Sequence, residues 1–156
     1  MTYLWVITLK SLLGRLWRFH ILAWANEQAA FLRAGRFDLL DIDHLAEEIE
    51  DVGKSEQREL MSRMAVLLMH LLKWHYQPSR RSSSWQRTIR EQRKLVNSRL
   101  RDTPSLKPRL VHPEWLSDVW SEAVTMAIDE TELDCFPDRL IWDLSQVLSP
   151  DWLPPD

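Results

Sequence analysis

The sequence predicts an all-α protein, a helical bundle built on a long antiparallel helix hairpin. The chain has 156 residues but only three glycines, and no stretch alternates β-branched with polar residues as a strand would. Between residues 41 and 77, apolar side chains recur every three or four positions, which is the period of an amphipathic helix. At 1.5 Å per residue this single helix would be about 50 Å long.

The composition predicts one helical domain over residues 20–156, because 45% of the chain is apolar and no linker or repeat divides it. Residues 1–19 form an N-terminal extension. Its apolar residues share one helical face, with Lys10, Arg15 and Arg18 nearby. We interpret it as a segment that can form an amphipathic helix and that packs on the body or is a loosely attached extension, with a membrane-surface helix as the alternative. No run of 18 apolar residues exists, so a membrane span is not expected.

Helix periods and end signals predict the elements before the long helix. Residues 21–34 read as a first core helix, followed by Gly35 at the usual C-terminal glycine position. In the corner over residues 36–41, Phe37 and Leu40 are expected to enter the core. Carboxylates in the first turns of the long helix oppose the positive end of its dipole, so this acidic cluster has a structural explanation.

The elements after the long helix follow from prolines and capping residues. Pro78 ends the long helix, and a short polar turn leads into a second long helix that ends near Leu100. A short helix is expected after Asp102-Thr103-Pro104, and another over residues 113–131. Asp143 is expected to cap a last short helix.

The length of the turn predicts how the two long helices pair. In such a hairpin the numbers of facing residues sum to about 160. Arg99 and Arg101 are therefore expected near Glu59 and Glu56. Exposed pairs of this kind contribute only about 0–1 kcal/mol each, so they set register more than stability.

Charge is distributed unevenly along the chain. Residues 38–59 carry a net charge of −7, residues 79–109 carry +8, and residues 110–156 carry −10. A block of +8 would suit nucleic acid. The two acidic blocks can face it instead, and we prefer this intramolecular compensation.

Tryptophan and cysteine usage bound the chemistry. The nine tryptophans are interpreted as filling wide gaps between helices, with a stacking platform for bases or a flat ligand as the alternative. The single cysteine, Cys135, excludes an internal disulfide and a cysteine-rich zinc site, and it indicates a reducing cytoplasm.

Anion recognition at the turn after the long helix is the best site hypothesis. Free N–H groups at a helix start, crowded by arginines, bind phosphate readily, and a tryptophan there could stack on a base or sugar. The alternative is that the serine caps, the arginines are solvated or paired with acidic segments, and Trp85 packs on Trp74. The candidate residues are Arg80, Arg81, Ser84, Trp85, Arg87 and Arg90.

A polar row at a spacing of seven lies beside the apolar stripe of the long helix. Its members are Glu56, Arg63, His70 and Gln77. The row is interpreted either as an interhelical network that fixes register or as a contact with another chain.

The sequence assigns no catalytic residue, no metal ligand and no cofactor. No Glu-x-x-His pair of the kind used by di-iron bundles occurs. Glu47 and His70 would lie about 35 Å apart on one helix, so they cannot share a metal. Ser82–Ser84 with His75 lack a nucleophile-elbow signature.

Three stretches carry a family resemblance: LRAGRFDLLDIDHLAEEIEDVGKSE, SRMAVLLMHLLKWHYQP and SSSWQRTIREQR. They resemble the bacterial "domain of unknown function 29" family, which is common in cyanobacteria, and the resemblance runs from about Trp24 to Pro154. It implies a small, helical, bacterial and cytoplasmic protein and no established activity. The chain departs from the family pattern at Phe19-His20-Ile21, where members begin with acidic and aromatic residues. Ile141-Trp142 replaces a proline-aromatic pair.

The function predicted from these observations is a non-catalytic binding or adaptor module in the cytoplasm. It would bind an anion or phosphate at the 80–90 turn, and its partner would be another protein or a second copy of itself. The alternative is a nucleic-acid-associated regulator that uses the basic face of residues 79–109. A metal-dependent or hydrolytic enzyme is the third possibility, and membrane contact is expected only through residues 1–19.

Overall fold

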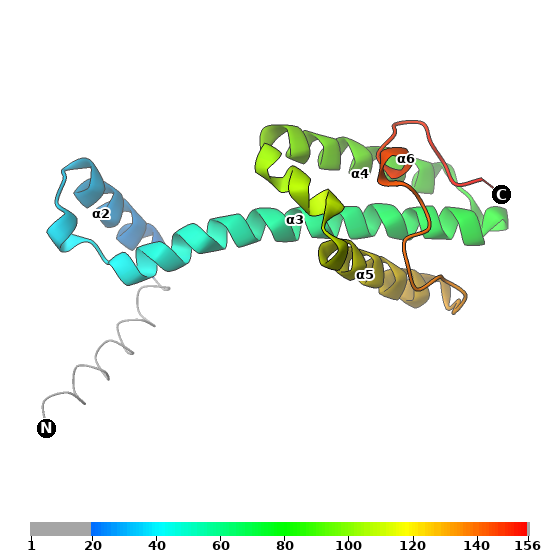
Figure 1. The fold of residues 1–156 in the computed structure, drawn as a ribbon, viewed down its shortest axis with the longest axis horizontal. Coiled ribbons are helices and arrows are strands. Elements are labelled where there is room, and N and C mark those ends of the chain that lie inside the picture. The colour runs from blue at the N-terminus through cyan, green and yellow to red at the C-terminus, as the bar shows by residue number, and fades with distance from the viewer. Residues whose placement is uncertain (1–19, 156) are drawn as a thin grey trace, which may run out of the picture. The chain divides into compact units, whose positions relative to one another are not determined.

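The computed structural model describes residues 20–155, and this part of the chain contains helices and no strand (Figure 1). The predicted all-α class is confirmed, whereas the helix predicted within residues 1–19 lies outside the described residues. The α-helices are α2 (Ile21–Arg33), α3 (Ile42–Tyr76), α4 (Ser83–Asp102), α5 (Pro113–Thr131) and α6 (Leu144–Val147). Three 3₁₀ helices cover Phe37–Leu39, Pro78–Arg80 and Pro104–Val111.

Contacts divide the chain within α3 into a first unit, residues 1–51, and a second unit, residues 52–156. The long helix predicted over residues 41–77 is confirmed as the 35-residue α3, which begins in the first unit and ends in the second.

In the described part of the first unit, α2 turns back toward the start of α3. Gly35 ends α2 with a φ of +70°, as expected from the sequence. The Arg36 amide donates to the Phe31 carbonyl over 2.9 Å, and the Gly35 amide donates to Leu32. These two bonds form a Schellman motif.

The interior of this first unit is polar. Gln28 is the one buried side chain within residues 20–51. Phe37 is 68% exposed, so the prediction that it enters the core is wrong. Within residues 20–51, α2 and the start of α3 are held by hydrogen bonds of Gln28 and Trp24 to Asp41, and the described residues there include no fully buried apolar side chain that the ring could join.

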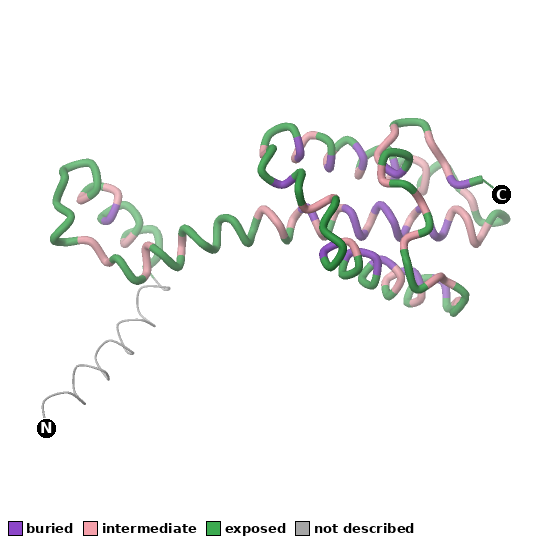
Figure 2. Tube along the Cα trace, viewed as in Figure 1, coloured by how far each residue is buried: buried purple, intermediate pink, exposed green. Residues whose placement is uncertain are grey.

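The second unit is built on an antiparallel hairpin of α3 and α4. The apolar stripe of α3 is fully covered from Leu60 to Leu72 (Figure 2). The core side chains opposite it are Ile89, Val96 and Leu100 of α4 and Val119, Trp120, Ala123 and Ala127 of α5.

The α3 stripe extends beyond the reach of its partner helix. Ile49 and Val52 were expected to be covered, but they are 72% and 66% exposed. Because α4 has only 20 residues against 35 in α3, the return helix reaches back to about Glu56, as its ion pair with Arg99 shows. Earlier positions of the stripe therefore have no partner in this hairpin.

The predicted register is confirmed at Arg99 and wrong at Arg101. The Arg99 guanidinium donates to Glu56 over 3.1 Å and also bonds Glu59. Arg101 instead contacts Ser98 and Asp102 on its own helix. Arg101 comes two residues after Arg99, so its side chain projects from the helix about 200° away from that of Arg99 and points to solvent.

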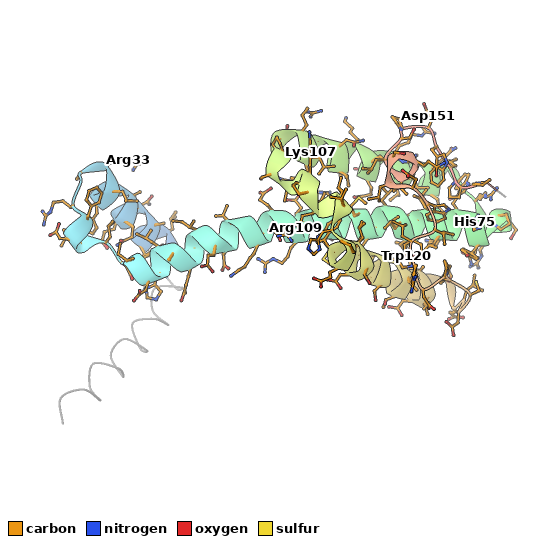
Figure 3. All side chains as sticks on the ribbon, in the orientation of Figure 1. Arg33, His75, Lys107, Arg109, Trp120 and Asp151 are labelled. Carbon is orange, nitrogen blue, oxygen red and sulfur yellow. The ribbon has the colours of Figure 1, made fainter. Side chains whose placement is uncertain are left out.

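The C-terminal segment packs on the bundle through tryptophan rings, and the ring it meets on α5 is that of Trp120, labelled in Figure 3. The Trp142 ring meets the Trp120 and Trp152 rings edge to face, each at 5.9 Å between centroids. The Trp120 indole N–H donates to the Pro137 carbonyl over 2.8 Å. The predicted cap is confirmed, since the Asp143 carboxylate accepts the Ser145 amide at the start of α6.

Candidate interaction surfaces

A small polar network holds the first unit together. The Asp41 amide donates to the Gln28 side-chain oxygen over 2.8 Å, and the Trp24 indole N–H donates to the Asp41 carboxylate over 3.3 Å. The His44 ring nitrogen lies 2.6 Å from the same carboxylate, and the Trp24 and His44 rings meet edge to face. Asp41 therefore links α2 to the first turn of α3.

This network also lowers the pKa of Asp41. Partial burial by itself raises the pKa of the carboxyl group, but hydrogen bonds from His44 and Trp24 outweigh it, and the net shift is downward. Asp41 is therefore charged at neutral pH. It also caps α3, since the His44 amide points at its side chain.

Exposed large apolar side chains gather in the first unit. Leu22 is 73% exposed on α2, and Ile42 and Ile49 are 60% and 72% exposed on α3. We call the exposed apolar residues of this unit the acidic apolar surface, because carboxylates accompany them. Its members are Ile21, Leu22, Leu32, Phe37, Leu39, Ile42 and Ile49.

The described residues of this unit carry a strongly negative charge. Residues 20–51 contain eight carboxylates and two arginines, which gives a net charge of −6 with neutral histidines. Asp43 and Glu47 lie between Ile42 and Ile49 in the sequence of α3, and both side chains are exposed. The sequence-based prediction had placed Ile49 in the core, and it had explained the acids by the helix dipole and by pairing with the basic block of residues 79–109.

At the start of α4, two of the predicted anion-binding residues take part in packing. Arg81 donates its Nε–H to the Trp74 carbonyl over 2.8 Å, and its guanidinium lies 5.2 Å from the Trp74 ring centre. The Trp85 ring is covered by the Lys73 ammonium at 4.6 Å. The helix is capped by Ser82, whose hydroxyl accepts the Trp85 amide.

The other predicted anion-binding residues point to solvent. Arg80, Ser84, Arg87 and Arg90 are exposed. Arg87 and Lys94 are seven residues apart and therefore lie on the same side of α4, with Arg90 between them. The exposed side of α4 is thus basic.

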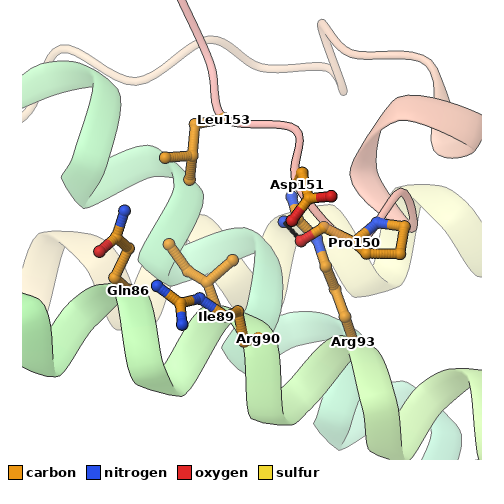
Figure 4. Close-up of a pocket in the computed structure, with 7 residues that line it drawn as sticks. All are labelled: Gln86, Ile89, Arg90, Arg93, Pro150, Asp151 and Leu153. Carbon is orange, nitrogen blue, oxygen red and sulfur yellow. Dashed lines mark hydrogen bonds between the residues drawn. The ribbon is translucent and has the colours of Figure 1, made fainter.

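Arg90 also borders a small pocket between α4 and the C-terminal segment (Figure 4). The cavity measures about 160 Å³. Its wall contains the buried Arg93, which donates to the backbone carbonyls of Val147, Pro150 and Trp152. Burial lowers the pKa of Arg93 and the nearby Asp151 carboxylate opposes that shift. Because Asp151 shares the pocket, an anion bound there would meet a like charge.

Members of the polar row have different partners. Glu56 bonds across to Arg99 of α4. Arg63 bonds Glu59 on its own helix, and the His70 ring nitrogen lies 3.0 Å from the Val66 carbonyl. Of the row members with the contacts given above, Glu56 is the one that bonds α4, so it is the member that helps to fix the register of the hairpin.

A buried lysine that sequence reasoning missed lies near the end of α3. Lys73 is 8% exposed, forms an ion pair with Glu130 of α5 and covers the Trp85 ring. The sequence signal for this burial was the position of Lys73, a charged residue that directly follows the core residues Leu71 and Leu72. Its partners lie far away along the chain.

Two further observations bear on the range of functions. Within residues 20–155, no three histidine, cysteine or acidic side chains gather closely enough to hold a metal ion. In the same residues no helix combines the length and the apolar character that crossing a bilayer requires.

Comparison with known proteins places the chain in a family. Residues 16–153 match the family described as "Domain of unknown function DUF29". No curated protein and no solved structure matches the chain.

Proposed function

Because the chain belongs to the DUF29 family, whose description assigns no function, we propose a function from the geometry: a non-catalytic module that binds another protein chain. The binding site is the acidic apolar surface of the first unit. The observation that carries this proposal is the exposure of Leu22, Ile42 and Ile49, each by 60% or more.

Uncovered aliphatic side chains favour burial against a partner. Removing one such side chain from water contributes roughly 1.5–3 kcal/mol. Outside the first unit, the described chain exposes only Val52, Val111 and Ile141 among its large apolar residues. Single exposed apolar residues are ordinary on a surface, whereas a group of them beside polar residues is typical of an interaction site.

Site-specific photo-crosslinking tests this proposal. A photoreactive amino acid at Ile49 should join the protein to a second polypeptide in the producing cell, and mass spectrometry should identify the joined residues. The matched control is the same substitution at Val111, which is 78% exposed in the second unit. Equal products from both positions, or no joined polypeptide from position 49, would contradict the proposed function.

A second candidate function is phosphate or nucleic-acid binding along α4. The supporting observation is the exposure of Arg87, Arg90 and Lys94 on that helix. The acidic residues of α3 neutralise Arg99 but leave this side of α4 basic. Lysine and arginine side chains that contact phosphates release counterions, so such binding weakens steeply with salt.

A salt titration with a generic DNA duplex tests the second candidate. Replacing both Arg87 and Lys94 by alanine should reduce the salt slope by about two, while Arg139→Ala, an exposed arginine outside α4, should leave it unchanged. Absence of binding at low salt would remove nucleic acid as a ligand.

Inorganic phosphate separates a local anion site from a nucleic-acid surface. If the start of α4 holds a phosphate group, phosphate should raise the melting temperature, and Arg80→Ala with Arg87→Ala should abolish that rise. Arg81 is unsuitable for this test because it bonds the Trp74 carbonyl. An unchanged thermal shift in the double variant would remove the anion site.

A further inference from the structure

We infer that the acidic apolar surface accepts a basic amphipathic helix from a different protein. This inference rests on the function proposed above and names the chemistry of the partner. Its basis is the arrangement of apolar and acidic side chains along the first turns of α3.

The apolar part of the site is a strip on one face of α3. Ile42 and Ile49 are seven residues apart, so their side chains project from the same side of the helix. Ala46, four residues after Ile42, adds a small exposed side chain beside them. A strip with this spacing fits a partner helix whose apolar residues recur at intervals of three and four.

An acidic residue borders the strip on the side away from α2. The inner side of this part of α3 is fixed by Asp41 and His44, which contact Trp24 of α2. Asp43 projects about 100° from the Ile42 direction and is exposed, whereas Glu47 projects about 140° from it, toward the far side of the helix. A partner that lies on the strip would place a flanking residue near the Asp43 carboxylate, which favours lysine or arginine there.

A second copy of this chain fits the surface poorly. Apposing two first units would bring together two copies of residues 20–51, each of net charge −6, and the whole of residues 1–51 carries −3, so the contact is unfavourable. The basic exposed side of α4 would complement the charge, but its residues Arg87, Arg90 and Lys94 offer no apolar strip. A partner that is both basic and apolar along one helix face satisfies both requirements.

The probe for this inference is a pair of synthetic helical peptides. Each has about 21 residues with leucine at every a and d heptad position, and the flanking e and g positions are lysine in one and glutamate in the other. The protein with all 156 residues should bind the lysine peptide at least ten-fold more tightly than the glutamate peptide in fluorescence anisotropy. Raising the salt concentration should narrow this difference.

Variants of the protein locate the binding. Replacing Ile42 and Ile49 together by serine should weaken lysine-peptide binding at least ten-fold, whereas Val111→Ser in the second unit should leave it unchanged. Replacing Asp43 by asparagine should reduce the preference for lysine over glutamate. These exposed substitutions do not touch the buried positions, and circular dichroism confirms the fold of each variant.

Several outcomes would overturn the inference. Equal binding of both peptides would assign the surface to apolar contact alone. A dimer that is lost in the Ile49→Ser variant would assign it to a second copy, and peptide affinity that rises on removal of residues 1–19 would assign it to that segment. If the peptide fails while crosslinking at position 49 still captures another chain, the partner chemistry is wrong and the proposed function stands.

Discussion

The guanidinium of Arg93 on α4 donates a hydrogen bond of 2.7 Å to the carbonyl oxygen of Val147, the last residue of α6. The same side chain bonds the carbonyls of Pro150 and Trp152. It is only 3% exposed. One buried cation therefore holds the C-terminal segment against the hairpin.

Replacing Arg93 by methionine should destabilise the protein by roughly 2–4 kcal/mol, because three charged hydrogen bonds are lost and the buried carbonyl of Val147 is left without this donor. Urea denaturation followed by circular dichroism measures this change. The neighbouring exposed Lys94→Met should stay within about 0.5 kcal/mol of the parent protein. Equal effects of the two substitutions would show that Arg93 does not hold the segment.

His70 should make stability depend on pH. Burial lowers the pKa of His70. The hydrogen bond to the Val66 carbonyl and the charge of Glu130 raise the pKa, whereas the charge of Lys73 lowers it further, and the net shift is downward. Since the pKa in the folded state lies below the unfolded value of about 6.5, the unfolded state binds more protons in the window between them. Stability should therefore fall as the pH drops through about 6.5 toward the folded pKa.

The measurement is the urea midpoint at about pH 7.5 and about pH 5.5. The His70→Gln variant should lose less stability between these conditions than the parent protein does. His112→Gln, at an exposed position before α5, should retain the parent difference. If His70→Gln shows the full acid destabilisation, His70 does not cause it.

Lys73 and Glu130 should be energetically coupled. Glu130→Gln leaves the buried ammonium of Lys73 without its carboxylate, although the ring of Trp85 still lies below it. In a double-mutant cycle with Lys73→Met, the two substitutions should cost less together than the sum of the single changes, with a coupling of about 1 kcal/mol or more. Additive effects would show that the ion pair contributes no coupling.

Most of the hairpin could be predicted from local signals. The apolar period, Pro78 and the short turn determine where α3 ends and which way α4 returns, and the pairing of Arg99 with Glu59 follows from counting residues. Counting does not give the rotation of each side chain around its helix. This is why Arg101 was placed beside Glu56 but contacts Asp102.

The candidate surface was hidden by the same apolar pattern. Ile49 continues the apolar stripe of α3 that contains the buried Leu60 and Leu67. The helical period of the apolar residues therefore predicted that Ile49 is buried as well. The lengths of the two helices carried the missing information, because the counted partner of Ile49 lies beyond the end of α4 at Asp102.

Arg93 shows the opposite limit of sequence reasoning. It lies four residues after Ile89 and three before Val96, on the same face of α4 as these core residues. Its burial could therefore have been inferred from the helical period. Its partners could not, because they are 54 to 59 residues away in a segment without regular periodicity.

The two described glycines should respond to alanine with opposite signs. Gly53 lies inside α3, and a Cβ there would meet nothing within 4 Å, so Gly53→Ala should stabilise the protein by about 0.5–1 kcal/mol. Gly35 has a φ of +70°, where a side chain costs about 1–2 kcal/mol, so Gly35→Ala should destabilise it. Urea denaturation measures both. Destabilisation by Gly53→Ala would mean that α3 is interrupted at this residue, because an uninterrupted helix with open space there has no reason to prefer glycine.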